Sequence, residues 1–207
     1  KLENLRVLNL AFNLITGELP QDLAQLPNLK VLKLEMNRLK GKLPGNIGEL
    51  SSLEELTAFN NFLSGSIPSS IGDIKKLKVL NLSSNALKGN IPESLGQLTQ
   101  LETLGLFENS LEGAIPGEMG SLKNLKELVL ANNSLNGEIP KEFDQLASLE
   151  VFQIQNNKFS SFKNLDALKE REFLVFDHDG FDKEYDFKEI KFSKTRMADT
   201  KFEDVEN

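Results

Sequence analysis

The sequence predicts an α/β solenoid built around a parallel β-sheet, because asparagine, glycine and proline each return at a fixed step of 24 residues. The asparagines are Asn13, Asn37, Asn61, Asn85, Asn109, Asn133 and Asn157. A period between about 20 and 50 residues is typical of solenoids, since each unit can bury its apolar face only against its neighbours. We therefore expect one continuous stack of repeats with a shared core.

Each repeat opens with leucines that alternate with other residues. In the fourth copy Leu80 and Leu82 follow this pattern shortly before Asn85. Such alternation predicts a short strand with its leucines pointing inward, and stacked copies then form one parallel sheet. The asparagine follows the strand, where its amide can pair with backbone groups that would otherwise be buried without partners. We expect these amides to form a ladder along the stack.

Glycine and proline mark the second half of each repeat. They are Gly17, Gly41, Gly65, Gly89, Gly113 and Gly137, followed by Pro20, Pro44, Pro68, Pro92, Pro116 and Pro140. Glycine permits backbone angles closed to other residues, and proline fixes φ and removes a donor, so this element ends one segment and sets the convex side. The stretch that follows, residues 94–101 in the fourth copy, is long enough only for a short helical turn. Glycines at a fixed step, outside a strand–GxxxxGK–helix context, do not indicate a phosphate loop.

The complete frame, LxxLxxLxLxxNxLxGxIPxxLGxL, resembles the leucine-rich repeat family in its 24-residue plant-type form. The fourth copy shows it from Leu77 to Leu98, and the resemblance covers roughly residues 2–160. Plant receptor ectodomains and plant inhibitors of fungal polygalacturonases carry this pattern. The resemblance implies a curved, right-handed superhelix with a concave sheet, found outside the cell or on its surface. It implies a non-enzymatic module that binds a protein or peptide and uses no cofactor.

The repeat frame also predicts the domain organisation. Residues 1–157 form seven copies, and the first is truncated at its start because Lys1 falls in the middle of a repeat. We expect an N-terminal portion to have been lost there. Residues 158–207 form a degenerate repeat and a C-terminal cap, in which acidic residues outnumber basic ones and phenylalanines are frequent. Phe173 and Phe176 stand one period beyond Leu149 and Phe152, which predicts an eighth strand.

Composition excludes several functional classes. A net charge of −7 and a pI near 5.0 argue against nucleic acid, whose phosphates need a basic stripe. No apolar stretch approaches the roughly 20 residues that span a bilayer, so we expect no membrane insertion. The chain contains no cysteine and a single histidine, His178, which excludes a cysteine–histidine nucleophile pair and most zinc sites. The absence of cysteine also fits a bacterial surface protein of the same repeat family.

The candidate binding residues are outward-facing positions that vary between copies. They are Phe12, Lys33, Glu35, Met36, Phe59, Asn60, Phe107 and Glu108. Large apolar side chains at positions expected to face water often mark an interface, and we expect Phe59 and Phe107 to anchor a partner. The alternative is that these rings pack internally at the loop edge. The acidic balance of this face favours a partner with basic surface. Two N-x-Ser sequons, at Asn81 and Asn132, also fall on or beside it.

The sequence suggests three alternatives to a receptor-like recognition module. An inhibitor of a secreted hydrolase, similar to the polygalacturonase inhibitors, would use the same concave face. Ice binding would favour a column of identical small polar residues, whereas the mid-strand column is irregular. This column reads Asn9, Lys33, Thr57, Asn81, Gly105, Val129 and Gln153. Asp177, Asp179 and Asp182 form part of a calcium-loop pattern, but the later ligands of such a loop are missing, so no metal site is assigned.

Overall fold

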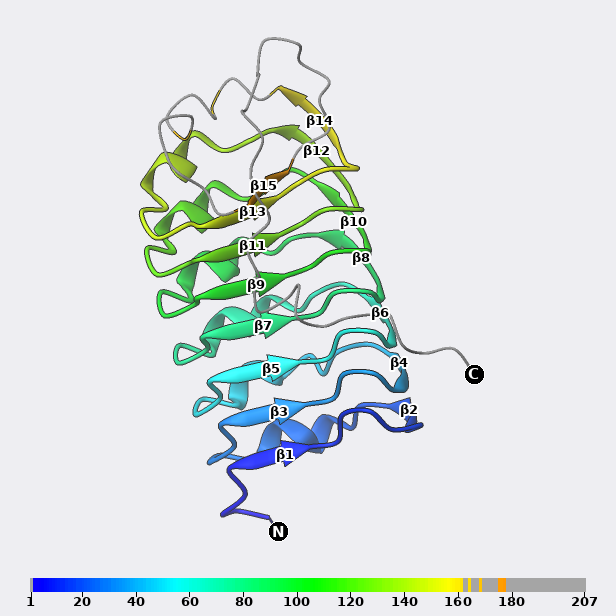
Figure 1. The fold of residues 1–207 in the computed structure, drawn as a ribbon. Coiled ribbons are helices and arrows are strands. Elements are labelled where there is room, and N and C mark those ends of the chain that lie inside the picture. Colours follow the sequence, from blue (N-terminus) through cyan, green and yellow to red (C-terminus); the bar gives the residue numbers. More distant parts are fainter. Residues whose placement is uncertain (1, 162–163, 165–167, 169–174, 178–207) are drawn as a thin grey trace.

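The protein is a regular stack of coils that rises from the N-terminus, with one strand of a large sheet in each coil (Figure 1). The computed structural model describes residues 2–161, 164, 168 and 175–177. Most of the expected C-terminal cap, including His178, Asp179 and Asp182, lies outside the described residues. The predicted solenoid is confirmed, and its core and two sheets run through the whole of the described stack.

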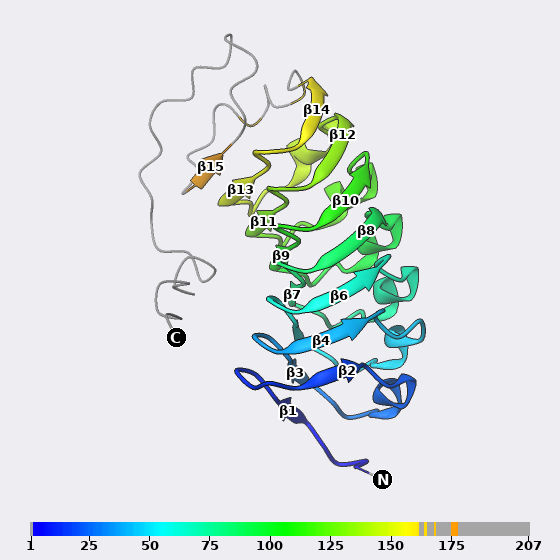
Figure 2. The same ribbon diagram turned by 90° about the vertical axis from the view of Figure 1, so that its right-hand side faces the viewer.

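The concave sheet holds eight parallel strands in chain order. They are β1 (Val7–Asn9), β3 (Val31–Lys33), β5 (Glu55–Thr57), β7 (Val79–Asn81), β9 (Thr103–Gly105), β11 (Glu127–Val129), β13 (Val151–Gln153) and β15 (Val175–Asp177). Neighbouring strands pair one full period apart, so that Leu56 lies opposite Leu80. Phe152 lies opposite Phe176 in the same way, which confirms the predicted eighth strand. Figure 2 shows the stack bending towards this sheet.

Short 3-10 helices form the opposite side of the coils. They are η1 (Gln21–Gln25), η2 (Ile47–Glu49), η3 (Ser69–Asp73), η4 (Glu93–Gln97), η5 (Gly117–Ser121) and η6 (Lys141–Gln145). They confirm the predicted helical turns. In five of the six, the repeat proline directly precedes the helix; Pro92, for example, has an extended backbone before η4. Proline suits this place because the first turn of a helix needs no N–H from it.

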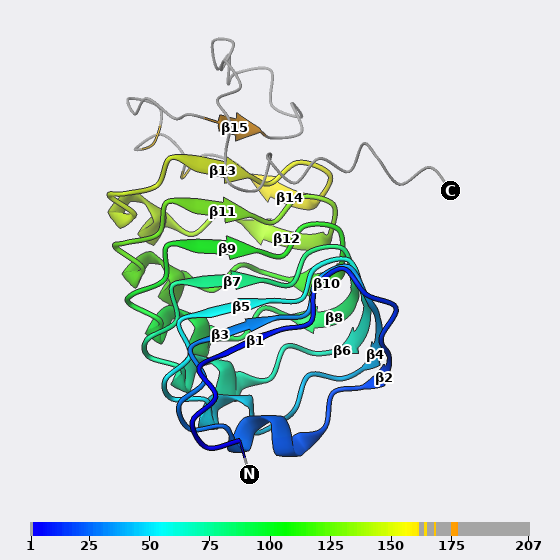
Figure 3. The same cartoon turned by 60° about the horizontal axis from the view of Figure 1, so that its bottom comes forward.

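A second parallel sheet, which the sequence analysis did not predict, joins the concave sheet to the helices (Figure 3). Its strands are β2 (Thr16–Glu18), β4 (Arg38–Gly41), β6 (Phe62–Gly65), β8 (Ala86–Asn90), β10 (Ser110–Gly113), β12 (Ser134–Glu138) and β14 (Lys158–Ser161). Each of β4 to β12 includes the repeat glycine with a positive φ, for example 77° at Gly89. The glycine is the last residue of β4, β6 and β10, as the sequence predicts, whereas β8 and β12 continue for one residue beyond it.

The interior is one continuous apolar core shared by all the coils. Leu80 and Leu82 from the concave side, Leu87 of β8 and Leu95 of η4 are each fully buried within it. No single coil could bury these side chains alone, which is why stacking holds the fold together.

The asparagine ladder is confirmed in detail. The Asn85 amide nitrogen donates to the backbone oxygens of Ala58, Leu82 and Ser83 at 3.0, 3.1 and 3.0 Å. Its side-chain oxygen accepts from the backbone N–H of Leu63 at 2.9 Å. One side chain thus pairs four backbone groups drawn from two repeats. The same pattern recurs at Asn37, Asn61, Asn109 and Asn133.

Candidate functional site

The outward side of the concave sheet carries the candidate binding residues. In β5 and the residues after it, Leu56 and Ala58 point into the core, so Glu55, Thr57 and Phe59 point outward. The equivalent residues of every coil form columns that run along the stack one period apart. Side chains in one column come from strands about 4.8 Å apart and can therefore contact each other directly.

Lys33 and Glu35, from the second repeat, are both engaged with the third. The ammonium group of Lys33 lies 2.9 Å from Oε1 of Glu55. The hydroxyl of Thr57 donates to Oε2 of Glu35 at 2.6 Å, and Glu35 is only 7% exposed. These two residues therefore form a fixed polar layer between neighbouring strands. The ammonium group of Lys33 and one carboxylate oxygen of Glu35 are therefore already paired within the fold.

Phe12, Met36, Asn60 and Glu108 share an unusual backbone conformation. Their φ angles are 57°, 57°, 53° and 53°, in the left-handed region. The same holds in every repeat for the residue just before the ladder asparagine. This residue turns the chain out of the concave sheet, so its side chain lies at the rim. Phe12 is 69% exposed there, whereas the sulfur of the half-buried Met36 accepts from the Asn60 amide at 2.8 Å.

The two phenylalanines expected to anchor a partner lie at equivalent places two repeats apart, but their environments differ. Phe59 is 8% exposed. Phe107 is half-buried and packs against Val129 and Val151, which are themselves buried. These three side chains come from three successive coils. They form a small apolar cluster on the concave sheet, separate from the main core.

Polar groups surround this cluster. Glu108 is exposed and its Oε2 accepts from the Ser84 hydroxyl at 2.8 Å. Gln155 stands two repeats beyond Phe107 in the same column, and its buried Oε1 has no hydrogen-bond partner among the described residues. A buried acceptor of this kind is uncommon in a folded protein.

The two sequon asparagines already make hydrogen bonds within the concave surface. Asn81 lies in the middle of β7, and its side-chain oxygen accepts from the backbone N–H of Ser83 at 3.1 Å. Asn132 lies at the rim and accepts from the amide of Asn156 at 2.7 Å. A glycan at Asn81 would stand directly on the candidate binding surface.

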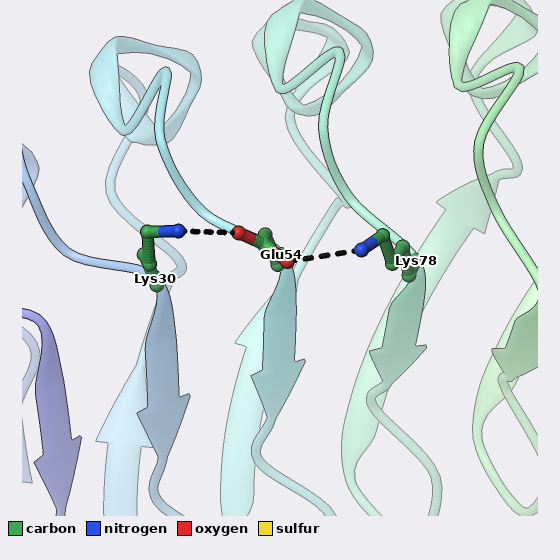
Figure 4. Close-up of polar contacts among 3 residues, drawn as sticks. All are labelled: Lys30, Glu54 and Lys78. Carbon is green, nitrogen blue, oxygen red and sulfur yellow. Dashed lines mark hydrogen bonds and ion pairs between the residues drawn. The ribbon is translucent and has the colours of Figure 1, made fainter.

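A column of alternating charge borders the concave sheet. From β3 to β13 the residue just before each strand reads Lys30, Glu54, Lys78, Glu102, Lys126 and Glu150 in successive repeats. The carboxylate of Glu54 lies 2.9 Å from Nζ of Lys30 and 3.0 Å from Nζ of Lys78 (Figure 4). Hydrogen bonds from Lys30 first, and then from Lys78, lower the pKa of Glu54 from its usual 4.5 to about 2. Lys126 pairs with Glu102 at 2.8 Å.

This charge alternation is visible in the sequence, because side chains 24 residues apart alternate between positive and negative charge. The Phe107 cluster had a weaker signal, since its members occupy three different positions in the repeat. Among the described residues, no group of three or more His, Cys, Asp or Glu side chains could hold a metal ion. No helix in the described part is long and apolar enough to cross a bilayer.

The fold and its surface define a solenoid with one 24-residue unit per coil, a concave parallel sheet and an internal asparagine ladder. Models described as leucine rich repeat match residues 3–63, 76–98 and 124–146. The chain belongs to the leucine-rich repeat family and is of its plant-type class. No curated protein matches the sequence.

Solved structures similar to this chain include plant receptor ectodomains. The ectodomain of the Arabidopsis thaliana receptor kinase GASSHO1/SCHENGEN3, in complex with CASPARIAN STRIP INTEGRITY FACTOR 2, is 34% identical with a TM-score of 0.78. That match covers 84% of this chain and 22% of the receptor chain. The Arabidopsis receptor kinase HAESA, in complex with the peptide hormone IDA and the co-receptor SERK1, is 38% identical with a TM-score of 0.75. It covers 77% of this chain and 27% of that one.

A plant ice-binding protein is also similar. It is 26% identical with a TM-score of 0.64, and the match covers 83% of this chain and 72% of that protein. This chain thus spans about a quarter of the length of the two receptor chains but most of the length of the ice-binding protein. The same repeat scaffold therefore supports different functions, and the surface residues must distinguish between them.

Proposed function

We propose that this chain recognises a peptide or an extended protein segment through its concave surface, outside the cell. The observation that carries the proposal is the apolar cluster of Phe107, Val129 and Val151 on the concave sheet. An apolar ligand side chain would cover the exposed part of the Phe107 ring, while the exposed carboxylate of Glu108 next to it offers a partner for a basic group. Ligand sites commonly combine an apolar surface with a few placed polar groups in this way. The similar receptor ectodomains, one of them bound to a peptide hormone, support the extracellular setting.

Within this surface, Phe107 is the better anchor than Phe59. Phe59 is 8% exposed and offers a ligand little additional contact area. Phe107 is half-buried, so its ring is supported from below by Val129 and Val151 and still reaches the surface. Binding hot spots are typically aromatic side chains held in well-packed surroundings. Phe12 and Met36 would contact a ligand only at the rim of the concave sheet, where their left-handed backbone places them.

Charge on the concave side favours a ligand with basic character. Lys33 is paired with Glu55, while Glu108 is exposed and bonded only to the neutral hydroxyl of Ser84 among the described residues. Complementary charge of this kind mainly speeds association and sets specificity. We therefore expect faster association with basic peptides at low salt, and a loss of this advantage as salt rises.

Ice binding is the second candidate because a similar solved structure has that function. The mid-strand column argues against it, since Lys33, Thr57, Gly105 and Val129 give no flat array of like groups. Thermal hysteresis of the purified chain decides the matter directly. Hysteresis that Thr57→Ala or Gln153→Ala reduces would establish ice binding in place of peptide recognition.

The test begins with a phage-displayed library of random 12-residue peptides, panned against the immobilised chain. Selected peptides are then measured by isothermal titration calorimetry against the parent, Phe107→Ala and Phe62→Ala. Phe62 is an exposed phenylalanine on the second sheet and is the matched control. We expect Phe107→Ala to weaken binding by about 2 kcal/mol, which is roughly 30-fold, because it removes the central anchor. Phe62→Ala should leave this affinity unchanged.

Circular dichroism and thermal melts establish that both variants keep the fold. Selected peptides that bind Phe107→Ala as tightly as the parent, while the fold is intact, would contradict the proposed site.

A further inference from the structure

The outer face of the second sheet carries a basic surface in the second to fourth repeats. We call it the basic face, and it consists of Arg38, Lys40 and Lys42, from β4 and the residue after it, Phe62 of β6 and Lys88 of β8. All five side chains are exposed, and Phe62 is 63% exposed. The corresponding segments, residues 38–42, 62–66 and 86–90, contain no acidic residue. These strands run along the side of the stack that faces the viewer in Figure 2.

The pairing register of β4 and β6 places the cations of β4 relative to Phe62. Lys40 of β4 lies directly opposite Phe62 of β6. Arg38 and Lys42 are two residues before and after Lys40, so they point to the same side of the sheet. The stem of Lys42 crosses onto β6, because a Cβ on Gly65 would lie 2.9 Å from Cγ of Lys42. Lys40 therefore lies beside Phe62, and Lys42 lies over the end of the same strand at Gly65.

The positive side chains of the basic face take no part in the ion pairs of the described residues. Within the described part of the chain, no ion pair or side-chain hydrogen bond engages Arg38, Lys40, Lys42 or Lys88. The nearest carboxylate on this sheet belongs to Glu18, opposite Lys40, and its side chain lies over Gly41. By contrast, Lys30, Lys33, Lys78 and Lys126 along the concave sheet are all paired with glutamates.

The repeat architecture does not require these residues. Further along the same sheet, β10 and β12 carry serine, glutamate and asparagine at the outward positions, as in Ser110, Glu112 and Asn136. The chain as a whole has a net charge of −7, so a local cluster of four cations without ion pairs among the described residues runs against its composition. An exposed phenylalanine amid polar residues often marks an interaction site. The basic face therefore has the chemistry of a second binding surface.

We propose that the basic face docks an acidic segment of a partner protein, independently of the concave surface. Carboxylates of the segment pair with Arg38, Lys40 and Lys42, while one apolar side chain covers Phe62. Three strands at about 4.8 Å spacing make a face roughly 10 Å wide, which matches a short peptide segment. A nucleic acid needs a longer basic stripe to neutralise successive phosphates, and Glu112 and Glu138 on the same sheet end this one.

The test uses a fluorescein-labelled peptide with two Glu-Asp pairs flanking a phenylalanine, and a matched peptide with lysines in place of the acids. Binding by fluorescence anisotropy is compared for the parent, Lys40→Ser with Lys42→Ser, Phe62→Ser and Lys76→Ser. Serine occurs at the Phe62 position in the fifth repeat, as Ser110. Lys76 is an exposed lysine outside both sheets and controls for the loss of a lysine elsewhere on the surface.

We expect the acidic peptide to bind, the lysine peptide not to bind, and affinity to fall at least 10-fold in the double lysine variant and in Phe62→Ser. Lys76→Ser and Phe107→Ala should bind the acidic peptide like the parent. This separates the inference from the concave-surface proposal, because each phenylalanine controls for the other face. No acidic-peptide binding, equal binding by all variants, or displacement by polyuridylate at lower concentration than by unlabelled peptide would each overturn the inference.

Discussion

The side-chain oxygen of Asn85 accepts a hydrogen bond from the backbone N–H of Leu63 at 2.9 Å, across the boundary between two repeats. The N–H belongs to a residue that is fully buried, so water cannot replace the asparagine. Each repeat therefore depends on the next one to complete its hydrogen bonding. This coupling between neighbours is what makes the stack cooperative.

Replacing the ladder asparagine should destabilise the stack in proportion to the groups it leaves unpaired. We expect Asn85→Ala to lower the free energy of unfolding by about 1–3 kcal/mol, because buried backbone groups lose their partner. Asn13→Ala is the control, since Asn13 is exposed and donates to two carbonyls, those of Leu10 and Ala11. Urea unfolding followed by circular dichroism measures both. Equal losses for the two variants would contradict the argument.

Glycines between neighbouring 3-10 helices should resist any added side chain. A Cβ on Gly96 of η4 would collide with the backbone oxygen of Glu118 in η5, whereas a Cβ on Gly45 would meet no atom within 4 Å. We expect Gly96→Ala to destabilise the protein by about 1–3 kcal/mol through overpacking. Gly45→Ala should change stability little. Thermal melts of the two variants compare their stabilities. An unchanged melting temperature for Gly96→Ala would show that η4 and η5 can move apart at little cost.

The left-handed residue before each ladder asparagine should prefer asparagine itself. Phe12 has φ of 57° and is 69% exposed, so it bears the strain with little packing in return. We expect Phe12→Asn to raise stability by up to about 1 kcal/mol, because asparagine tolerates this region better than other non-glycine residues. Phe12→Val should lower stability, since a β-branched side chain fits this region poorly. A melt in which the valine variant exceeds the asparagine variant would refute this ranking.

The Glu54 ion pairs should make stability depend on pH in the acid range. Its pKa falls to about 2 in the folded protein, from 4.5. A carboxylate with a lowered folded-state pKa binds fewer protons folded than unfolded, so its contribution is complete above about pH 4.5 and is lost as pH falls towards 2. Glu54→Gln should therefore flatten the dependence of the urea midpoint on pH across this window. High salt should reduce the difference, because the pairs are exposed to solvent.

A matched control for this experiment is Glu93→Gln, an exposed carboxylate without an ion pair in the described part of the chain. It changes the net charge equally but removes no lysine contact. NMR titration of the Glu54 carboxyl carbon gives its pKa directly. A titration midpoint near 4.5 would show that Lys30 and Lys78 do not hold the carboxylate in solution.

Periodicity made the repeat frame predictable, because Asn85 and Leu80 stand in an environment that every copy reproduces. It also placed the eighth strand opposite Phe152. The second sheet was missed because six of its seven strands contain the repeat glycine, which sequence patterns associate with turns. The left-handed backbone at Phe12 and Met36 was missed for a similar reason. Those side chains vary freely, and only the backbone geometry is shared.

The candidate surface was predictable in outline only. Its residues were expected on one face, and Phe59 and Phe107 do lie at equivalent places along the concave sheet. Their exposure could not be read from the sequence, because burial depends on side chains from neighbouring coils. Phe107 gains its support from Val129 and Val151, 22 and 44 residues further along the chain.

The sequence by itself determined the stack, its inward leucines and its asparagine ladder, since these interactions repeat with the period and need no knowledge of any other segment. Tertiary structure alone decided which variable side chains meet across neighbouring coils. The Phe107 cluster and the basic face around Phe62 both arise in this way. The physical reason is that strand register, set by the backbone of adjacent coils, brings together residues whose spacing carries no recurring pattern.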